Sequence, residues 1–221
     1  SGATWQNEDQ CISGKCLKFD GVDDTVKIGD VDQLDMGTSD FTIGAWIRHT
    51  TGLTSSYDSA IFEKISATDG YRFTFRETLA GGTGGRLLFG IRTSSTTTEI
   101  ESNTALNDDK WHYVAVVADR DGSATFYVDG KSDGSGSISA RSASLNNTAQ
   151  AIIGTTNSFF KGSIDEPKVY NFALSAAQIK ANYASRSTNE GVSAQIGNPN
   201  LWKSLSEGLV GYWKMDESTT T

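Results

Sequence analysis

The sequence is poor in proline, cysteine and histidine, with two of each among its 221 residues, and it lacks long apolar runs. Without a run of about 18 apolar residues it has no candidate transmembrane helix, so we expect no membrane insertion. It also lacks the charged and then apolar N-terminal pattern of a secretory leader. The G-x-S-x-G match at Gly130–Gly134 follows an arm of a predicted hairpin and precedes no predicted helix, so it is not the strand-to-helix elbow of a serine hydrolase. Histidines are few, which also argues against a hydrolase built on a serine–histidine pair.

The sequence also lacks an excess of positive charge. Lys and Arg number 19 against 27 Asp and Glu, which gives a formal net charge of −8. An acidic chain repels phosphate backbones, so nucleic acid is not an expected partner. Hydrophobic residues make up 37% of the chain, which argues against disorder by composition. The chain begins with SGATW and not with Met, which favours a fragment or a processed product.

What the sequence does contain is the residue alternation of β-strands. Residues 110–131 predict a β-hairpin, with arms at 111–118 and 124–128 that are rich in β-branched and aromatic residues. Asp-Arg-Asp-Gly at 119–122 supplies the turn between the arms, and Asp129-Gly130 supplies a second turn. An isolated hairpin is only marginally stable in water, so the rest of the chain must add strands.

Further strands are predicted on both sides of this hairpin. Residues 1–15 are expected to be irregular, with Trp5 as an anchor. Pro167 cannot donate to a sheet ladder, so it is expected at an edge or a bulge. A single helix is predicted from the capping box Ser175–Gln178 to about Ser185. The strands are predicted at 15–20, 25–28, 40–48, 60–65, 71–76, 86–92, 97–101, 137–140, 150–154, 161–170 and 209–215.

These elements, separated by turns rich in Gly, Ser and Thr, define the expected fold class. It is all-β, a two-sheet antiparallel jelly-roll sandwich with one short C-terminal helix. Cys11 and Cys16 are too few for a structural zinc site. In an extracellular protein they would close a small loop as a disulfide, whereas in a reducing compartment they would remain thiols. We expect the disulfide, since Ser13 and Gly14 between them are turn residues.

Five segments of the chain stand out together: KFDGVDDTVKI (18–28), DFTIGAWI (40–47), KWHYVAVV (110–117), ATFYVDGK (124–131) and GSIDEPKVYNFALSAAQI (162–179). In this order they resemble the laminin-G-like, concanavalin A-like jelly-roll domains, over about residues 11–185. Thr25 stands where that family usually has an aromatic residue, and Pro167 where it usually has an aliphatic one. Both departures bear on local packing or loop geometry. The resemblance implies a secreted or cell-surface domain over residues 1–186.

The end of the chain departs from the order of that family. GLVGYWKMDES (208–218) is similar to the family's opening strand, so the chain looks cyclically shifted, with 187–206 as a linker and 207–221 as a terminal strand. Either this segment begins a following repeat, or it fills the vacant first-strand slot of its own or a neighbouring jelly roll. We expect the second, because these side chains would otherwise be exposed: Leu209, Val210, Tyr212, Trp213 and Met215. Pairing with a neighbour would be head-to-tail and would propagate a filament.

Four aspartates offer hard oxygen ligands at turns or strand ends: Asp20, Asp23, Asp24 and Asp165. The resemblance implies that the FDG and IDE strands run near each other and hold a structural Ca²⁺, with Asp20 and Asp165 as the first candidates. Calcium takes about 6–8 oxygen ligands, several of them usually backbone carbonyls. The alternative is that these aspartates are turn-formers and solvated charges.

Catalysis is not predicted. Glycosidases of this general fold carry E-x-D-x-x-E on one strand, and residues 162–167 lack the first Glu. Asp165 and Glu166 are adjacent, so on a regular strand they face opposite sides and do not act on one bond. For a sugar ligand the aromatic candidates are Tyr57 and Phe159, whereas Phe160 is expected to fill the core.

Two classes of function follow. The shifted strand favours a non-catalytic extracellular structural or adhesive module, a filament or tandem-array subunit. Residues 208–215 would then join it to copies of itself or to adjacent repeats. The alternative is a calcium-stabilised carbohydrate-binding, lectin-like module of a larger surface protein, with glycans as partners.

Overall fold

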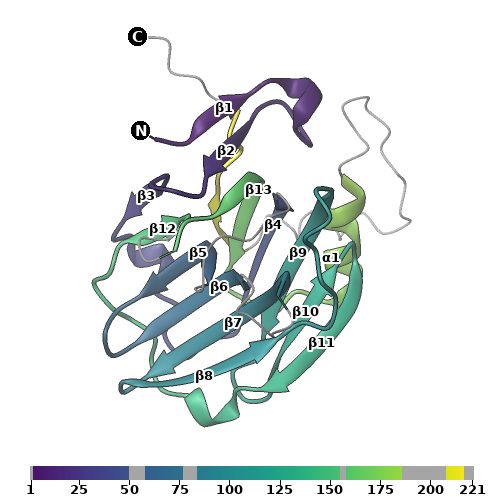
Figure 1. Cartoon of the computed structure of the whole chain (residues 1–221). Coiled ribbons are helices and arrows are strands. Elements are labelled where there is room, and N and C mark those ends of the chain that lie inside the picture. The colour runs from purple at the N-terminus through teal and green to yellow at the C-terminus, as the bar shows by residue number, and fades with distance from the viewer. Residues whose placement is uncertain (1, 50–57, 77–83, 155–157, 186–207, 217–221) are drawn as a thin grey trace.

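Two antiparallel sheets lie face to face in the computed structural model, which describes residues 2–49, 58–76, 84–154, 158–185 and 208–216 (Figure 1). Within these residues there are fourteen strands and one α-helix, α1 (Ala176–Ala184). The predicted all-β sandwich with one short helix is therefore confirmed. No helix in the described ranges is long and apolar enough to cross a membrane.

The eight-stranded sheet has the spatial order β1 (Thr4–Gln6), β2 (Cys16–Asp20), β13 (Lys161–Tyr170), β4 (Phe41–His49), β9 (Trp111–Ala118), β10 (Ser123–Val128) and β11 (Lys131–Ser137), and β14 (Leu209–Tyr212) also pairs with β13. The six-stranded sheet has the order β3 (Val26–Gly29), β12 (Ala151–Ile153), β5 (Ser59–Ile65), β6 (Gly70–Arg76), β7 (Arg86–Thr93) and β8 (Thr96–Glu101). Strands distant in sequence are thus neighbours in both sheets, as in a jelly roll.

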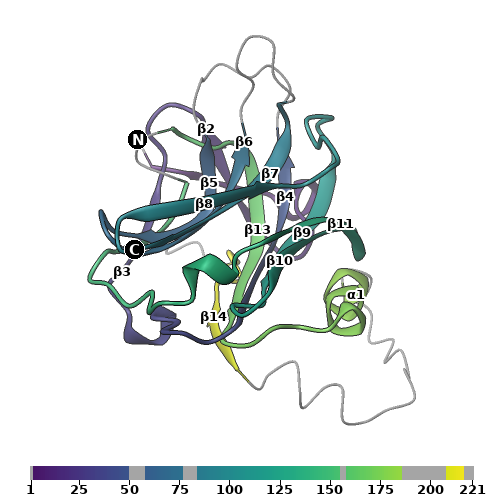
Figure 2. The same ribbon diagram turned by 90° about the horizontal axis from the view of Figure 1, so that it is seen from below.

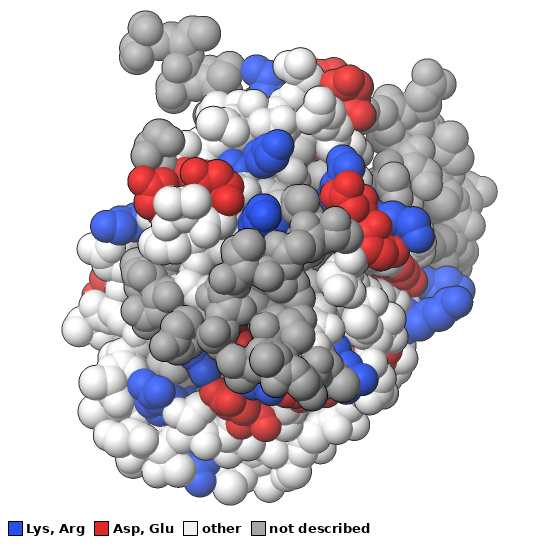
Figure 3. Space-filling model, in the orientation of Figure 1, with Lys and Arg blue, Asp and Glu red and all other residues white. Residues whose placement is uncertain are grey.

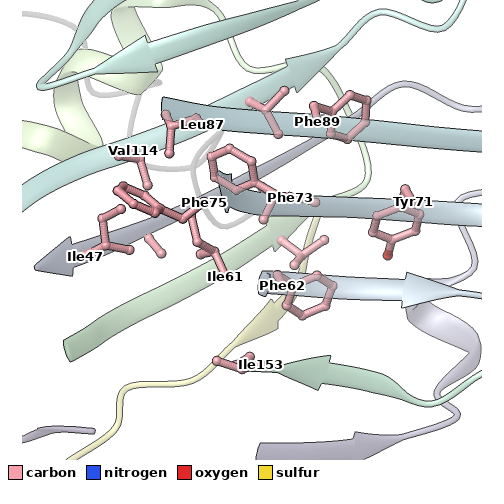
Figure 4. Packing of buried hydrophobic residues seen from close by; sticks show 14 of the residues in the cluster. Ile47, Ile61, Phe62, Tyr71, Phe73, Phe75, Leu87, Phe89, Val114 and Ile153 are labelled. Carbon is pink, nitrogen blue, oxygen red and sulfur yellow. The ribbon is translucent and has the colours of Figure 1, made fainter. Parts of the chain in front are cut away.

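The main core lies between the two sheets. Alternate residues of β4 (Phe41, Ile43 and Ile47) belong to it, as the sequence alternation predicts, together with Phe73 and Phe75 of β6. Figure 4 shows Ile47 close to Phe75 in this layer. All five are at most 1% exposed. Burying one such side chain contributes about 1.5–3 kcal/mol, so this layer supplies most of the driving force for the fold.

The helix α1 lies beside the eight-stranded sheet (Figure 2), and a second apolar cluster lies beneath it on the outer face of that sheet. Trp46 of β4 stacks on Tyr183 of α1, with ring centroids 5.6 Å apart, and meets Tyr113 of β9 edge-on at 5.5 Å. The helix begins at the predicted capping box, in which Ser175 and Gln178 satisfy each other's backbone N–H groups. The helix covers the part of this face that carries Trp46, Tyr113 and Tyr170.

Two expectations about local structure are corrected by the structure, and one is confirmed. Residues 1–15 are not wholly irregular, because β1 pairs with β2, and Trp5 in β1 is 40% exposed and not an anchor. The weaker strand expected at 137–140 is replaced by β11, which pairs with β10 and is followed by a short 3-10 helix. Pro167 lies at a register shift between β13 and β4, so the predicted bulge is confirmed.

Two buried cations were not anticipated from the sequence. Arg120, 1% exposed, donates to the backbone carbonyls of Gly37 and Ala143 at 3.1 and 2.7 Å. Lys64, fully buried, contacts the carboxylates of Asp30 and Asp35 at 2.8 and 3.1 Å. Buried charges persist only when paired or hydrogen-bonded, and both side chains meet that requirement.

Candidate functional site

The terminal strand β14 lies in the sheet of its own chain. It pairs antiparallel with residues 168–170 of β13, and the N–H of Trp213 donates to the carbonyl of Pro167 at 3.1 Å. β2 pairs with residues 161–164 of β13, whose other edge is occupied by β4. β14 and β2 therefore share one edge of β13, end to end, on either side of the Pro167 bulge. The predicted linker, 187–206, lies outside the described residues.

The predicted side chains of this segment divide between two environments. Val210, Trp213 and Met215 pack against the main core, and the Trp213 ring lies 5.6 Å from that of Phe62 in the opposite sheet. Leu209 instead packs against the cluster under α1. Tyr212 is 40% exposed, and its hydroxyl donates to Glu166 Oε2 at 2.6 Å.

The two cysteines form a disulfide, as expected, with a Cα–Cα distance of 5.5 Å. The loop that they close is held by two carboxylates from distant segments. The N–H groups of Ile12 and Ser13 donate to Asp165 Oδ2 at 3.0 and 3.2 Å. The N–H of Lys15 donates to Asp216 Oδ1 at 2.9 Å. The loop thus ties β13 to the segment that follows β14.

Asp165 is fully buried beneath this loop. Burial raises the pKa of its carboxyl from 3.8 to about 7, against the hydrogen bonds from the backbone of Ser13 and Ile12, which lower it. Its second oxygen, Oδ1, has no hydrogen-bond partner in the described residues. The residue is a buried anchor for the disulfide loop, and it is shielded from any ligand in solvent.

The acidic residues predicted to bind calcium do not all meet. Asp20, Asp23 and Asp24 place carboxylate oxygens within 4.8 Å of one another at the turn after β2. Asp165 is not in this group: Asp20 lies opposite Lys161, and Asp165 follows four residues later along β13, which corresponds to about 13 Å on a strand. The structure therefore separates the two residues that the resemblance placed first.

The turn itself has one feature of an ion site. Asp24 is only 3% exposed, and its Oδ2 accepts the N–H of Asp20 at 2.9 Å, while Oδ1 has no partner among the described residues. Asp20 Oδ1 accepts the N–H of Val22 at 2.8 Å. Asp20 and Asp23 each place one carboxylate oxygen within 4.8 Å of an oxygen of Asp24, and this donor set is of the hard type that suits calcium.

A hollow of about 510 Å³ lies on the outer face of the six-stranded sheet. We refer to it as the polar hollow; its polar lining comes from β5, β6, β7 and the turns beside them, and its apolar lining residues include Ile65 and Ile152. Acidic and basic side chains are interspersed over this side of the molecule (Figure 3). The polar lining residues are Glu63, Ser66, Arg72, Arg92 and Gln150.

Strand register explains how these residues come together. Ile152, Glu63, Arg72, Gly90 and Glu99 lie opposite one another in a single row across β12, β5, β6, β7 and β8. Arg72 lies flat over Gly90, where an added Cβ would stand 2.8 Å from Arg72 Nε, and it reaches the carboxylate of Glu99. Glycine at position 90 thus leaves room for an arginine to lie across the sheet.

Neither aromatic residue predicted to contact a sugar lines this hollow. Tyr57 lies outside the described residues. Phe159 is half-buried just before β13, and Phe160 fills the core, as expected. The sequence signal that could have found the hollow is the alternation of polar Glu63, Arg72 and Arg92 with apolar residues in their strands, since outward polar positions mark the solvent side.

Known proteins share this arrangement of strands. A family model described as the concanavalin A-like lectin/glucanases superfamily matches residues 20–180. No curated protein matches the chain. The match contains four of the five segments on which the resemblance to this family was based and begins inside the first, at Asp20, the last residue of β2; it ends in α1.

Solved structures share the fold at low sequence identity. The binding domain of Paraclostridial Mosquitocidal Protein 1 has a TM-score of 0.64 and 14% identity, with 84% of this chain and 46% of that chain covered. The binding domain of botulinum neurotoxin serotype G has a TM-score of 0.63 and 16% identity, with 79% and 43% covered. The chain therefore spans less than half the length of these toxin domains. A heptameric SAP-like pentraxin from Limulus polyphemus has a TM-score of 0.54 and 14% identity, with 74% and 78% covered.

Proposed function

The chain belongs to the concanavalin A-like lectin/glucanases superfamily, and from this membership we propose that it is a non-catalytic, extracellular carbohydrate-binding module. The observation that carries the proposal is the polar hollow, a concave site lined by a few charged and amide groups and by the apolar side chains of Ile65 and Ile152. The Cys11–Cys16 disulfide supports an oxidising, extracellular setting. A similar structure, of botulinum neurotoxin type C, is described as depending for cell entry on two ganglioside molecules.

The carboxylates that a glycosidase would use argue for binding and against hydrolysis. Retaining glycosidases place two carboxyl groups about 5–5.5 Å apart on either side of the bond that breaks. Here Asp165 is fully buried under the disulfide loop, while Glu166 is held by the Tyr212 hydroxyl and by Lys168 Nζ at 3.1 Å. Neither group faces the polar hollow, so we expect no hydrolysis of a bound sugar.

A glycan array with the purified chain tests the binding proposal, together with a reducing-sugar assay on the glycans that bind. We expect selective binding and no release of reducing ends. Absence of binding to every glycan class would overturn the proposal, and turnover above the buffer rate would overturn its non-catalytic part.

Calcium binding at Asp20, Asp23 and Asp24 is proposed as a stabilising feature of this module. The buried, unpartnered Oδ1 of Asp24 supports it, because an ion would satisfy an oxygen that otherwise costs desolvation energy. The test compares the melting temperature in millimolar calcium with that in EDTA, for the natural chain and for the matched variant Asp24→Asn. We expect a lower Tm in EDTA for the natural chain and a smaller difference for the variant; equal Tm values in both buffers would exclude the ion.

Exchange of β14 between copies is a second proposal, for a structural or adhesive role. The sequence placed this role first; the pairing of β14 with its own β13 satisfies the strand within one chain, so we place it second. The same contacts could form with the β13 of a neighbour, as in domain swapping. Light scattering and negative-stain microscopy of the full chain and of a chain lacking residues 207–221 test it. Filaments or oligomers that vanish on truncation would support exchange; a monomer throughout would exclude it.

A further inference from the structure

We propose that the polar hollow binds an acidic saccharide, with Arg92 pairing with the carboxylate or sulfate of that sugar. This inference rests on the proposed carbohydrate-binding function and specifies its site and ligand class. It is carried by an arginine whose charge is not matched by an anion in the surrounding structure.

The arginines on this face differ in their partners. Arg72 pairs with Glu99, and Arg76 pairs with Asp58 at 3.3 Å and with Glu101. Arg92 instead donates from Nε to Thr97 Oγ1 at 2.8 Å and from Nη1 to the carbonyl of Ser66 at 3.0 Å. Both acceptors are neutral, and no carboxylate in the described ranges forms an ion pair with Arg92. Its positive charge therefore remains available to an anionic ligand.

The same two hydrogen bonds hold the guanidinium in place. Arginine has five N–H donors in a planar fork, so two are used and the others remain for a ligand. A carboxylate or sulfate matches that fork with two parallel hydrogen bonds. Because these two hydrogen bonds already hold Arg92 in the lining of the hollow, ligand binding would cost little additional side-chain entropy.

The rest of the lining suits a sugar ring attached to that anion. Gln150 supplies an amide acceptor and donor for hydroxyl groups, and Ile65 and Ile152 supply apolar surface for the C–H face of a ring. A volume of about 510 Å³ falls within the usual range of small-molecule sites. Of the two arginines in the lining, Arg72 is neutralised by Glu99, so Arg92 is the cation that an anionic group on the sugar would meet.

The net charge of −8 on the whole chain opposes an anion at long range. Recognition must therefore come from close contact with Arg92. We expect modest affinity that weakens as salt is raised, since an exposed ion pair is screened at physiological ionic strength.

Isothermal titration with three matched oligosaccharides tests the inference: one carrying uronate carboxylates, one carrying sulfates and one neutral. The variant Arg92→Gln removes the charge, and Arg86→Gln is the control. Arg86 lies on the same strand and, six residues away, on the same face, but outside the hollow. We expect binding of at least one anionic sugar, a tenfold or greater loss in Arg92→Gln and less than a twofold change in Arg86→Gln. The stronger of the two anionic ligands identifies the group that Arg92 recognises.

A second variant keeps the test informative if Arg92→Gln fails to fold. Gln150 is exposed and lines the hollow, so Gln150→Trp fills the site without disturbing the core and should also abolish binding. Unchanged affinity in both variants, or equal binding of the neutral sugar, would overturn the acidic-sugar site while leaving carbohydrate binding in place. Failure of all three sugars to bind, together with a blank glycan array, would overturn both.

Discussion

Side chains alternate between the inner and outer faces in both sheets, but the outward side chains of the two sheets have different roles. On the eight-stranded sheet the outward residues Trp46, Tyr113 and Tyr170 are apolar or aromatic, and α1 covers them. On the six-stranded sheet the outward residues of β6 and β7 include Arg72 and Arg92, which line the polar hollow. The first face adds a second core, whereas the second leaves charged groups where a ligand can reach them.

The two faces also treat charge differently. Asp165 shares the outer face of the eight-stranded sheet with Trp46, which lies directly opposite it, and its carboxyl is buried without a cationic partner. On the other face, Arg72 and Arg76 form ion pairs with Glu99, Glu101 and Asp58. Charge is therefore costly on the covered face, whereas on the face with the hollow Arg72 and Arg76 are compensated by carboxylates and Arg92 bonds to neutral acceptors. Four experiments can break or sharpen this contrast.

The largest expected effect comes from truncating the aromatic layer under α1. Trp46→Ala should lower the free energy of unfolding by about 3–5 kcal/mol, because a large buried ring is lost and a cavity remains. Arg76→Ala on the other face should cost no more than about 1 kcal/mol, since its partly exposed ion pairs are screened by water. Urea unfolding measures both. Similar losses in the two variants would show that the faces are energetically alike.

Asp165→Asn should change how stability depends on pH. The folded carboxyl keeps its proton up to about pH 7, whereas the unfolded chain releases it near pH 3.9. Between about pH 4 and 7 the folded state thus binds more protons, and stability falls as pH rises, by up to about 1.4 kcal/mol per pH unit. The neutral amide removes this slope. Urea unfolding at several pH values in that window measures it, and parallel curves for the two proteins would refute the raised pKa.

Reduction of the disulfide should have a smaller effect. The loop between Cys11 and Cys16 is short, so cross-linking it contributes about 2 kcal/mol by restricting the unfolded chain. Because the loop buries Asp165, its loosening should also flatten the pH dependence described above. Melting with and without reductant provides the measurement, with Asp165→Asn as the background in which the pH effect must disappear.

Gly90→Ala should have the smallest effect on stability. The new methyl group would stand 2.8 Å from Arg72 Nε, so the flexible arginine must shift while the backbone stays in place. We expect a change in stability below about 1 kcal/mol and a clear change in the NMR resonance of the Arg72 Nε–H group. A loss as large as that of Trp46→Ala would mean that the face with the hollow is also part of the structural core.

Much of this fold follows from the sequence, because strong alternation fixes strands such as β4 and β9 and the Pro167 bulge follows from a missing N–H. β11 is not predictable in this way: Gly134, Gly136 and its serines carry no apolar periodicity, and backbone pairing with β10 makes the strand. The polar hollow depends on the register of four strands, which no single stretch encodes. Register also separates Asp20 from Asp165, so the four aspartates predicted to bind calcium do not meet at one place.

The position of β14 on β13 has a consequence for the nascent chain on the ribosome. β4, β9 and β13 are all synthesised before residues 209–212, so residues 168–170 of β13 have an unpaired edge until the end of this sequence emerges. The space filled by Trp213 beside Phe62 stays open for as long. We therefore expect the nascent domain to expose this strand edge until β14 emerges. During that time a chaperone, or a neighbouring nascent chain on the same polysome, can bind the edge.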